Sequence, residues 1–293
     1  MPEPVRPPAP APDPAASAFA LPPVVDAAWV RERLGALVLA DVRWFLDGRS
    51  GRDAYRAGHL PGAVWVDVDT VLSAPADEVE GRHPLPDPED FARALGALSV
   101  GDGTTVVAYD ADGGAYAARL VWLLRSTGRP AALLDGGLAA WEGERETGDV
   151  TPVPAVLTPV DWPRDLLRTA DEVASGEAVV LDARAADRYS GAAVLPSDKA
   201  SGHVPGARSA PWAGNLAPDG SFHTPERLRE RFRALGVEEG TGVVVYCGSG
   251  VTACHDLLAL ERAGVTGAAL YPGSWSAWSA DPSRPVATGQ EPG

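Results

Sequence analysis

A single cysteine stands where an apolar run meets a glycine-rich turn. The run "VVVY" ends at Tyr246, Cys247 follows, and "GSGVT" leads into a stretch with helical periodicity. Gly248 and Gly250 allow backbone N–H groups to turn towards one centre, and the start of a helix adds the positive end of its dipole. If the anion held there is the cysteine sulfur, the pKa of the thiol falls and a thiolate forms near neutral pH. We therefore expect Cys247 to be a nucleophile.

A thiolate in such a loop is suited to two reactions. Phosphate-ester hydrolysis needs an arginine at the sixth position after the cysteine, and that position is Ala253. Sulfur transfer needs no arginine in the loop, since the thiolate takes a sulfane sulfur from a donor, becomes a persulfide and passes the outer sulfur to an acceptor. The sequence favours sulfur transfer. The other cysteine, Cys254, falls within the expected helix and is predicted to be a core residue.

The elements that position this cysteine occur twice in the chain. Each half contains an apolar run ending in Asp-x-Arg, then Gly-His-x-Pro-Gly-Ala, then a second apolar run. In the first half Asp110 takes the position of Cys247, and the spacing from Asp110 to Trp141 equals that from Cys247 to Trp278. Because both halves share the Asp-x-Arg and Gly-His features, we interpret these as scaffold.

Alternating apolar runs and amphipathic stretches predict parallel strands that are buried on both faces and covered by helices. Right-handed crossovers then give a three-layer α/β sandwich. Ligands of such sheets bind beyond the carboxyl ends of the strands, where Cys247 is placed. In the second half we expect strands at Ala178–Leu181, Gly242–Tyr246 and Ala268–Leu270, and helices at Pro225–Leu235 and Thr252–Ala263.

Proline-punctuated segments divide the chain into domains. The predicted organisation is a disordered tail over residues 1–22, an N-terminal domain over 23–146, a linker over 147–165, a catalytic C-terminal domain over 166–281 and a second tail over 282–293.

The Gly-His-x-Pro-Gly-Ala pair, "YCGSGVTA" and "YPGSWSAW" resemble the tandem-domain sulfurtransferases of the rhodanese family, roughly from Val24 to Ala280. The resemblance implies an α/β fold of two tandem rhodanese-like domains, each with a central parallel sheet flanked by helices, and a site at their interface. It also implies that only the C-terminal domain carries the reactive cysteine, as the presence of Asp110 in the first repeat suggests.

The loop itself resembles one branch of that family. Thiosulfate-preferring members commonly have Cys-Arg-Lys-Gly, whereas members that use 3-mercaptopyruvate have an uncharged Cys-Gly-Ser/Thr-Gly-Val-Thr loop. Here Ser249 lies between the two glycines, and the loop ends with Val251 and Thr252. The resemblance implies that Gly248, Gly250, Val251 and Thr252 bind the donor. Thiosulfate remains the alternative donor.

The same branch holds the donor carboxylate with two arginines. The first maps to Arg188 in "DARAADRYSG". The second normally lies shortly before the Gly-His turn, where this chain has no arginine. Lys199 lies nearby and is either a replacement that acts as a point charge or a surface residue.

The branch also places a Ser-His-Asp set beside the cysteine, which polarises the donor carbonyl or moves a proton. By motif, Ser249 supplies the hydroxyl, His83 in "GRHPLP" the imidazole and Asp69 in "WVDVDT" the carboxylate. His83 has no counterpart in the second half, which favours a role in the site.

Charge and composition restrict the partners. With 25 basic and 40 acidic residues the net charge is −15, which argues against nucleic acid and anionic membranes. Two cysteines cannot form a disulfide framework, and a cytoplasmic location is expected. The expected partners are a small anionic sulfur donor and a thiol, cyanide or thioredoxin-like acceptor, with no metal or organic cofactor. A non-catalytic sulfur-binding or regulatory module remains the alternative of another class.

Overall fold

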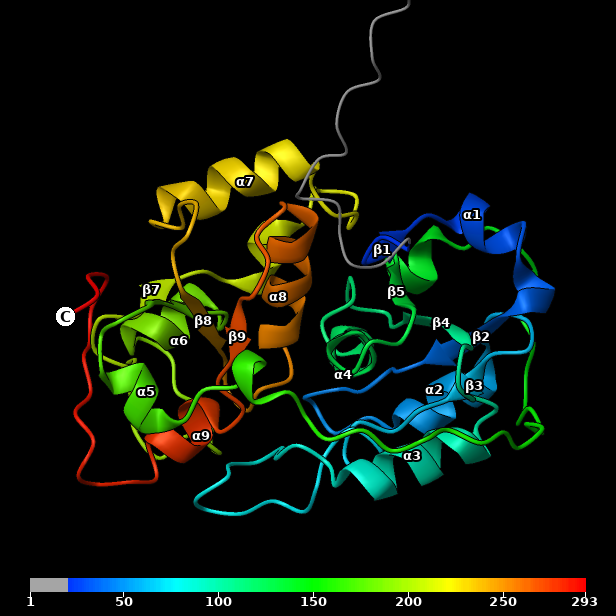
Figure 1. Cartoon of the computed structure of the whole chain (residues 1–293), viewed down its shortest axis with the longest axis horizontal. Helices are drawn as coiled ribbons and strands as arrows, with labels where there is room; N and C mark the ends of the chain where they lie inside the picture. The colour runs from blue at the N-terminus through cyan, green and yellow to red at the C-terminus, as the bar shows by residue number, and fades with distance from the viewer. Residues whose placement is uncertain (1–20) are drawn as a thin grey trace, which may run out of the picture.

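The computed structural model describes residues 21–293, so the tail predicted over residues 1–22 lies almost wholly outside the described residues. The described residues form two parallel sheets, each with helices on both faces (Figure 1). Strand order is β1-β5-β4-β2-β3 in the first sheet and β7-β6-β8-β9 in the second. Every strand pair in both sheets is parallel, which confirms the predicted α/β fold.

The first sheet and its helices comprise β1 Val24–Val25, α1 Ala27–Arg31, β2 Leu37–Asp41, α2 Gly51–Ala57, β3 Val64–Trp65, α3 Pro88–Ala97, β4 Thr105–Tyr109, α4 Ala117–Ser126 and β5 Ala131–Leu134. The second comprises α5 Ala170–Ala174, β6 Val179–Asp182, α6 Ala186–Ser190, β7 Arg208–Ser209, α7 Pro225–Ala234, β8 Val243–Tyr246, α8 Ala253–Arg262, β9 Ala269–Leu270 and α9 Ser274–Trp278. The strands and helices expected in the second half agree with these bounds to within one residue.

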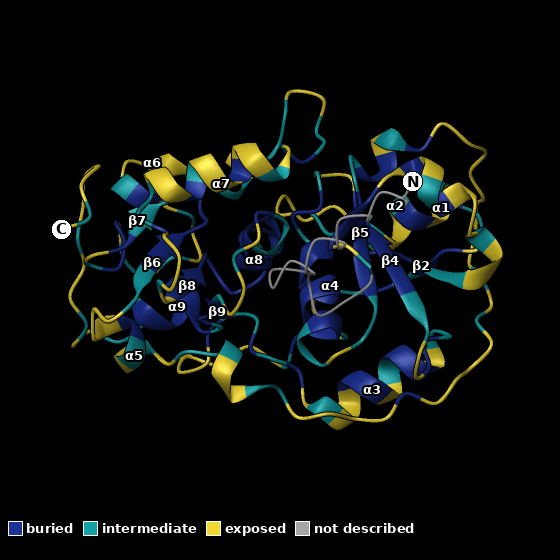
Figure 2. Ribbon diagram, turned by 45° about the horizontal axis from the view of Figure 1, so that its top comes forward, coloured by how far each residue is buried: buried dark blue, intermediate teal, exposed yellow. Residues whose placement is uncertain are grey.

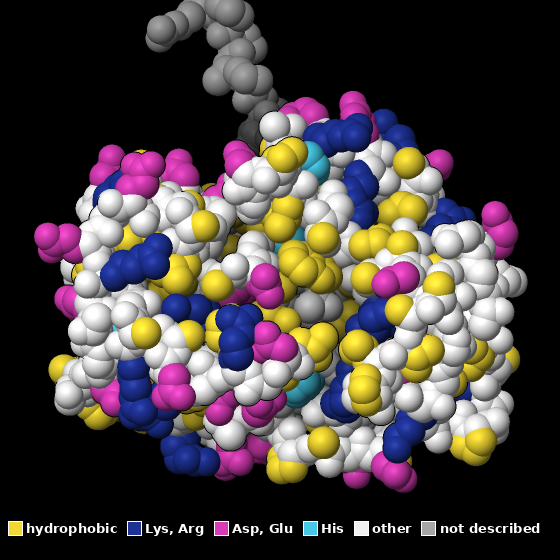
Figure 3. All heavy atoms as spheres, turned by 180° about the vertical axis from the view of Figure 1, so that it is seen from behind, with side chains coloured by type: hydrophobic (Ala, Val, Ile, Leu, Met, Phe, Trp, Pro, Cys, Tyr) yellow, Lys and Arg dark blue, Asp and Glu magenta, His cyan; other side chains and the backbone are white. Residues whose placement is uncertain are grey.

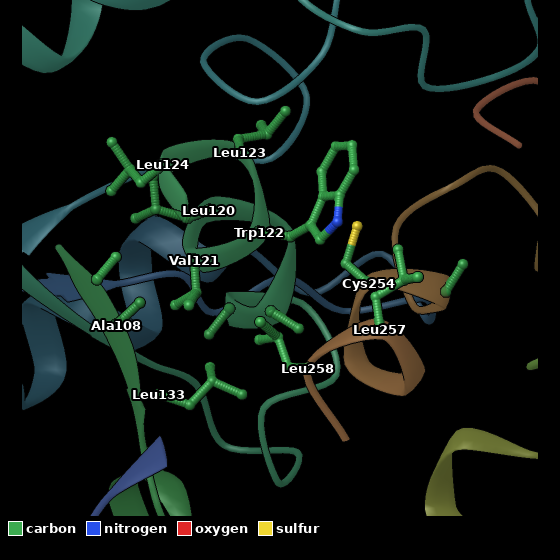
Figure 4. Close-up of a cluster of buried hydrophobic side chains, with 14 of the residues drawn as sticks. Ala108, Leu120, Val121, Trp122, Leu123, Leu124, Leu133, Cys254, Leu257 and Leu258 are labelled. Carbon is green, nitrogen blue, oxygen red and sulfur yellow. The ribbon is translucent and has the colours of Figure 1, made fainter. Parts of the chain in front are cut away.

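Helices α4 and α8 lie between the two sheets and join the domains (Figure 1). Both are almost completely buried, unlike α7, whose outer face is exposed (Figure 2). Figure 4 shows Trp122 of α4 beside Cys254 of α8, and both belong to one apolar cluster that also contains Leu123 and Leu257. Burying each large apolar side chain stabilises the fold by about 1.5–3 kcal/mol, so this contact fixes one domain against the other.

The two Asp-x-Arg features are buried ion pairs, as a scaffold role requires. A guanidinium nitrogen of Arg43 lies 2.6 Å from Asp41, and one of Arg184 lies 2.5 Å from Asp182. Each arginine also donates to the carbonyl of the glycine in the following Gly-His turn. The histidines of these turns are buried and each stacks on a tyrosine.

The segment between the domains and the chain end both pack on the domains. Residues 151–163 form no helix or strand and run along α3, where the Ala155 N–H donates to the Gly96 carbonyl (Figure 1). The segment 282–293, predicted as a tail, instead lies against the second domain through an antiparallel bridge between His203 and Ala287. The bridge gives hydrogen-bond partners to backbone groups of the Gly-His turn. In the first domain His59 and Glu146 form the equivalent bridge.

Charged side chains of both signs are spread over the face shown in Figure 3. Within residues 21–293, no helix has the length and the apolar character needed to cross a membrane.

Candidate active site

Cys247 lies directly after β8, with 1% of its surface exposed, at a cavity of about 400 Å³ between the domains. Because the carboxyl ends of parallel strands are open to ligands, β8 delivers the sulfur to the position predicted from the sequence. The first domain supplies an apolar wall of this cavity, formed by Trp44, Leu46, Val68 and Tyr116.

The loop after the cysteine leaves its amide groups available. Among the described residues, no acceptor is found for the backbone N–H groups of residues 248–252. Gly250 has a φ of +79°, and a Cβ there would lie 2.6 Å from the Pro272 carbonyl oxygen, so both conformation and space require glycine. The N–H of Cys247 itself donates to Ser274 Oγ at 3.2 Å. Backbone N–H groups without an acceptor in a turn of this kind can serve as donors to an anion.

The equivalent loop of the first domain holds an anionic side chain. Both carboxylate oxygens of Asp110 accept two backbone N–H groups each, at 2.8–2.9 Å, from Asp112, Gly114, Tyr116 and Ala117. Burial raises the pKa of Asp110, and these four hydrogen bonds oppose that effect because they favour the ionised form. The first domain therefore has the same strand–loop–helix arrangement as the second, but the backbone N–H donors of its loop are already bonded to the Asp110 carboxylate.

The structure brings together the predicted Ser-His-Asp set. His83 Nδ1 lies 2.7 Å from Ser249 Oγ, and His83 Nε2 lies 3.1 Å from Asp69 Oδ1. Asp69 also accepts from the indole N–H of Trp44. Burial lowers the pKa of His83, while Asp69 acts in the opposite direction. A neutral imidazole that donates to Asp69 is left with Nδ1 as an acceptor for the Ser249 hydroxyl.

Two guanidiniums converge on the loop. A Cβ placed on Gly248 would lie 3.0 Å from Arg82 and 3.2 Å from Arg188, so a larger residue there would displace both guanidiniums by a few tenths of an ångström. Both arginines line the cavity. The buried Nε of Arg188 finds no acceptor among the described residues. Lys199 is exposed and does not line the cavity, so the structure does not bring it to the site.

Arg82 is a cation that the sequence analysis missed. It comes from the first domain, next to His83, and donates to Ser197 Oγ at 2.8 Å. Its own backbone N–H is held by Ser276 of α9. Its place in the sequence directly before His83 could have indicated a role in the site, because neighbouring residues of a loop lie close together in space.

A second arginine of the first domain was also missed. Arg119 of α4 is fully buried, and it donates to the carbonyl of Gly250 at 2.9 Å and to that of His83 at 3.2 Å. It therefore connects the cysteine loop to the segment that carries the imidazole. Its signal was a charged residue inside the otherwise apolar stretch "AARLVWLL".

Cys254 lies in the interdomain core, as predicted, where burial raises the pKa of its thiol to about 12. Both cysteines are free thiols. Only Cys247 lines the cavity, so the chemistry of the site centres on that sulfur.

The fold is that of a known family. A model of the rhodanese-like domain matches residues 26–144 and again residues 166–281. This chain belongs to the rhodanese family, and the predicted tandem-domain sulfurtransferase is confirmed.

Several relatives carry more specific names. The chain is 43% identical to a probable 3-mercaptopyruvate sulfurtransferase of Pseudomonas aeruginosa, over 86% of this chain and 93% of that protein. It is 40% identical to the putative thiosulfate sulfurtransferase SseB of Mycobacterium tuberculosis, over 86% of this chain and 90% of that protein. The crystal structure of the 3-mercaptopyruvate sulfotransferase SseA from Escherichia coli superposes with a TM-score of 0.75 at 30% identity, covering 87% of this chain and 99% of that one.

Proposed function

We propose that this enzyme takes sulfur from 3-mercaptopyruvate, carries it as a persulfide on Cys247 and passes it to a thiol acceptor. The observation that carries this proposal is the uncharged loop around Cys247, with unpaired N–H groups on its backbone and two guanidiniums beside Gly248. The names of the relatives from Pseudomonas aeruginosa and Escherichia coli support the same donor.

The donor carboxylate binds Arg188 and Arg82, since guanidiniums pair with carboxylates through charge-assisted hydrogen bonds. Ser249 then lies on the loop between this anion subsite and His83, and its single hydroxyl proton, donated to His83 Nδ1 in the free enzyme, turns to the donor carbonyl when the substrate binds. In this proposal the transferred sulfur accepts from the amides of Gly248, Gly250, Val251 and Thr252, for which no acceptor is found among the described residues.

The reaction balances with these groups alone. The Cys247 thiolate attacks the donor sulfur, the carbon–sulfur bond breaks, and its electron pair leaves on carbon as the enolate of pyruvate. The enolate oxygen is stabilised by Ser249, and the proton that the new persulfide releases from its outer sulfur converts the enolate to pyruvate. In the second half-reaction an acceptor thiolate attacks the outer sulfur and regenerates the Cys247 thiolate. Cyanide or a thioredoxin-like protein would accept the sulfur in the same way.

Thiosulfate is the second candidate donor, because the relative from Mycobacterium tuberculosis is named for it. A dianion calls for more positive charge than the uncharged loop provides, so we rank it below mercaptopyruvate. We also propose a cytoplasmic location, where a reducing environment keeps both thiols free.

Intact-mass spectrometry after addition of each donor tests the proposal. We expect mercaptopyruvate to add one sulfur atom to the protein and to release pyruvate, with thiosulfate much less effective at equal concentration. Cys247→Ser should gain nothing, whereas Cys254→Ser, the matched control, should gain one sulfur atom. A Cys247→Ser protein that still gains sulfur, or a wild-type protein that gains none, would contradict the proposal.

A further inference from the structure

The two guanidiniums beside Gly248 share one carboxylate. Arg82 NH1 lies 3.2 Å from Asp198 Oδ1, and Arg188 NH2 lies 2.9 Å from Asp198 Oδ2. The Asp198 side chain is 2% exposed, against 28% for Arg82 and 17% for Arg188. Both arginines line the cavity and Asp198 does not, so the carboxylate lies behind the cations that an incoming anion meets.

This arrangement determines the charge of the anion subsite. Arg82 and Arg188 bring two positive charges, Asp198 removes one, and residues 248–252 add none. The buried Arg119 guanidinium behind the loop adds one positive charge, and the Cys247 thiolate of the proposed mechanism offsets it with one negative charge. Asp69 and Asp187 also lie nearby, but Asp69 is paired with His83 and the side chains of both are exposed, so solvent screens them. The subsite therefore presents a net charge of one positive unit.

On the basis of the function proposed above, we propose that Asp198 selects the sulfur donor by charge: it matches the subsite to a donor with one negative charge and disfavours a dianion. Mercaptopyruvate carries one carboxylate, which the net charge of the subsite balances. Thiosulfate brings a second negative charge into the same partly buried space, where an uncompensated charge is costly. Specificity of this kind depends on an unfavourable interaction with the wrong partner.

Asp198→Asn tests this inference, because it keeps the shape of the side chain and removes its charge. We expect the ratio of kcat/KM for mercaptopyruvate to kcat/KM for thiosulfate to fall at least about tenfold, which corresponds to about 1.4 kcal/mol. Asp187→Asn is the matched control. Asp187 precedes Arg188 and is exposed, so this change alters the net charge equally while leaving the guanidinium pair intact, and the donor ratio should stay the same.

A second measurement needs no turnover. Anions that fill the subsite should protect Cys247 from iodoacetamide, and peptide mass spectrometry gives the extent of modification. In Asp198→Asn we expect sulfate, a dianion, to protect at a concentration about tenfold lower than in the wild type, with a smaller change for pyruvate. This result is independent of sulfur transfer, so it separates failure of the inference from failure of the proposed function.

Ser197→Lys covers the case in which Asp198→Asn does not fold. Ser197 is exposed and contacts Arg82, so a lysine there adds positive charge while the buried carboxylate remains. Its donor ratio should move in the same direction. The inference is overturned if these variants change the use of both donors by the same factor, if sulfate and pyruvate protection are unaffected, or if Asp187→Asn produces the same shift as Asp198→Asn.

Discussion

Arg119→Met should weaken both the fold and sulfur transfer. Arg119 is fully buried, and its guanidinium donates to carbonyls of Gly250 and His83 at 2.9 and 3.2 Å, with longer contacts to Pro84 and Leu72 at 3.4 Å. Methionine fills much of the same space but leaves those carbonyls without their donor. Counting only the two shorter bonds at about 1.5–3 kcal/mol each, less the recovered desolvation of the charge, gives a loss of about 3 kcal/mol.

The assay combines thermal unfolding with stopped-flow measurement of persulfide formation. For a chain of this size about 3 kcal/mol corresponds to a fall in Tm of roughly 6–12 °C. At a temperature where the variant stays folded, we expect the rate of persulfide formation to fall at least about tenfold, because the cysteine loop and His83 lose their common anchor. Arg119→Lys keeps the charge but cannot reach both carbonyls, so it should recover only part of each loss.

Arg125→Met is the matched control. Arg125 lies on the same helix, is buried and forms an ion pair with Glu261 across the domain interface, away from the cysteine loop. It should lower Tm while leaving the rate of persulfide formation nearly unchanged. If Arg119→Met and Arg125→Met reduce the rate equally, Arg119 is merely structural, and an Arg119→Met protein with unchanged Tm would refute the energetic reasoning.

Two further predictions address the imidazole and the first repeat. Asp69→Asn removes the carboxylate that raises the pKa of His83 against the effect of burial, so that pKa should fall further. The acid limb of the kcat–pH profile should then move to lower pH, and the plateau rate should drop. A limb that moves to higher pH would exclude this arrangement. Asp110→Ala leaves four backbone amides of the first domain unpaired, so Tm should fall by several degrees and recover partly in sulfate, as measured by a thermal-shift assay. Asp110→Asn should lower Tm by less. If sulfate raises the Tm of the wild type by the same amount, the loop does not bind anions in the way described.

The sequence predicted the parts of the site that are local in the chain. A strand, a glycine-rich turn and the start of a helix, all within about ten residues of sequence, determine where Cys247 lies. Aligning the two halves of the sequence placed Asp110 at the equivalent point. The contact of Ser249 with His83 joins two domains, and it was predicted from the family resemblance rather than from spacing.

The second guanidinium could not be predicted in this way. The family pattern directed attention to the segment before the Gly-His turn of the second domain, where Lys199 is the nearest cation. The structure instead brings Arg82 from the first domain to Ser197 and Asp198. A contact between segments so far apart depends on how the domains pack, and that information is spread over the apolar faces of α4 and α8 rather than held in any motif.

The residues around Cys247 come from both domains, although only the second domain carries the cysteine. The second domain provides the sulfur and the amides around it, but the imidazole, one guanidinium of the anion subsite and the arginine that anchors the loop all come from the first domain. At the equivalent point of the first domain, the Asp110 carboxylate accepts from four backbone N–H groups of its own loop. The first domain therefore has no cysteine of its own but shapes the surroundings of Cys247, because its imidazole and its arginines contact the loop that follows that residue.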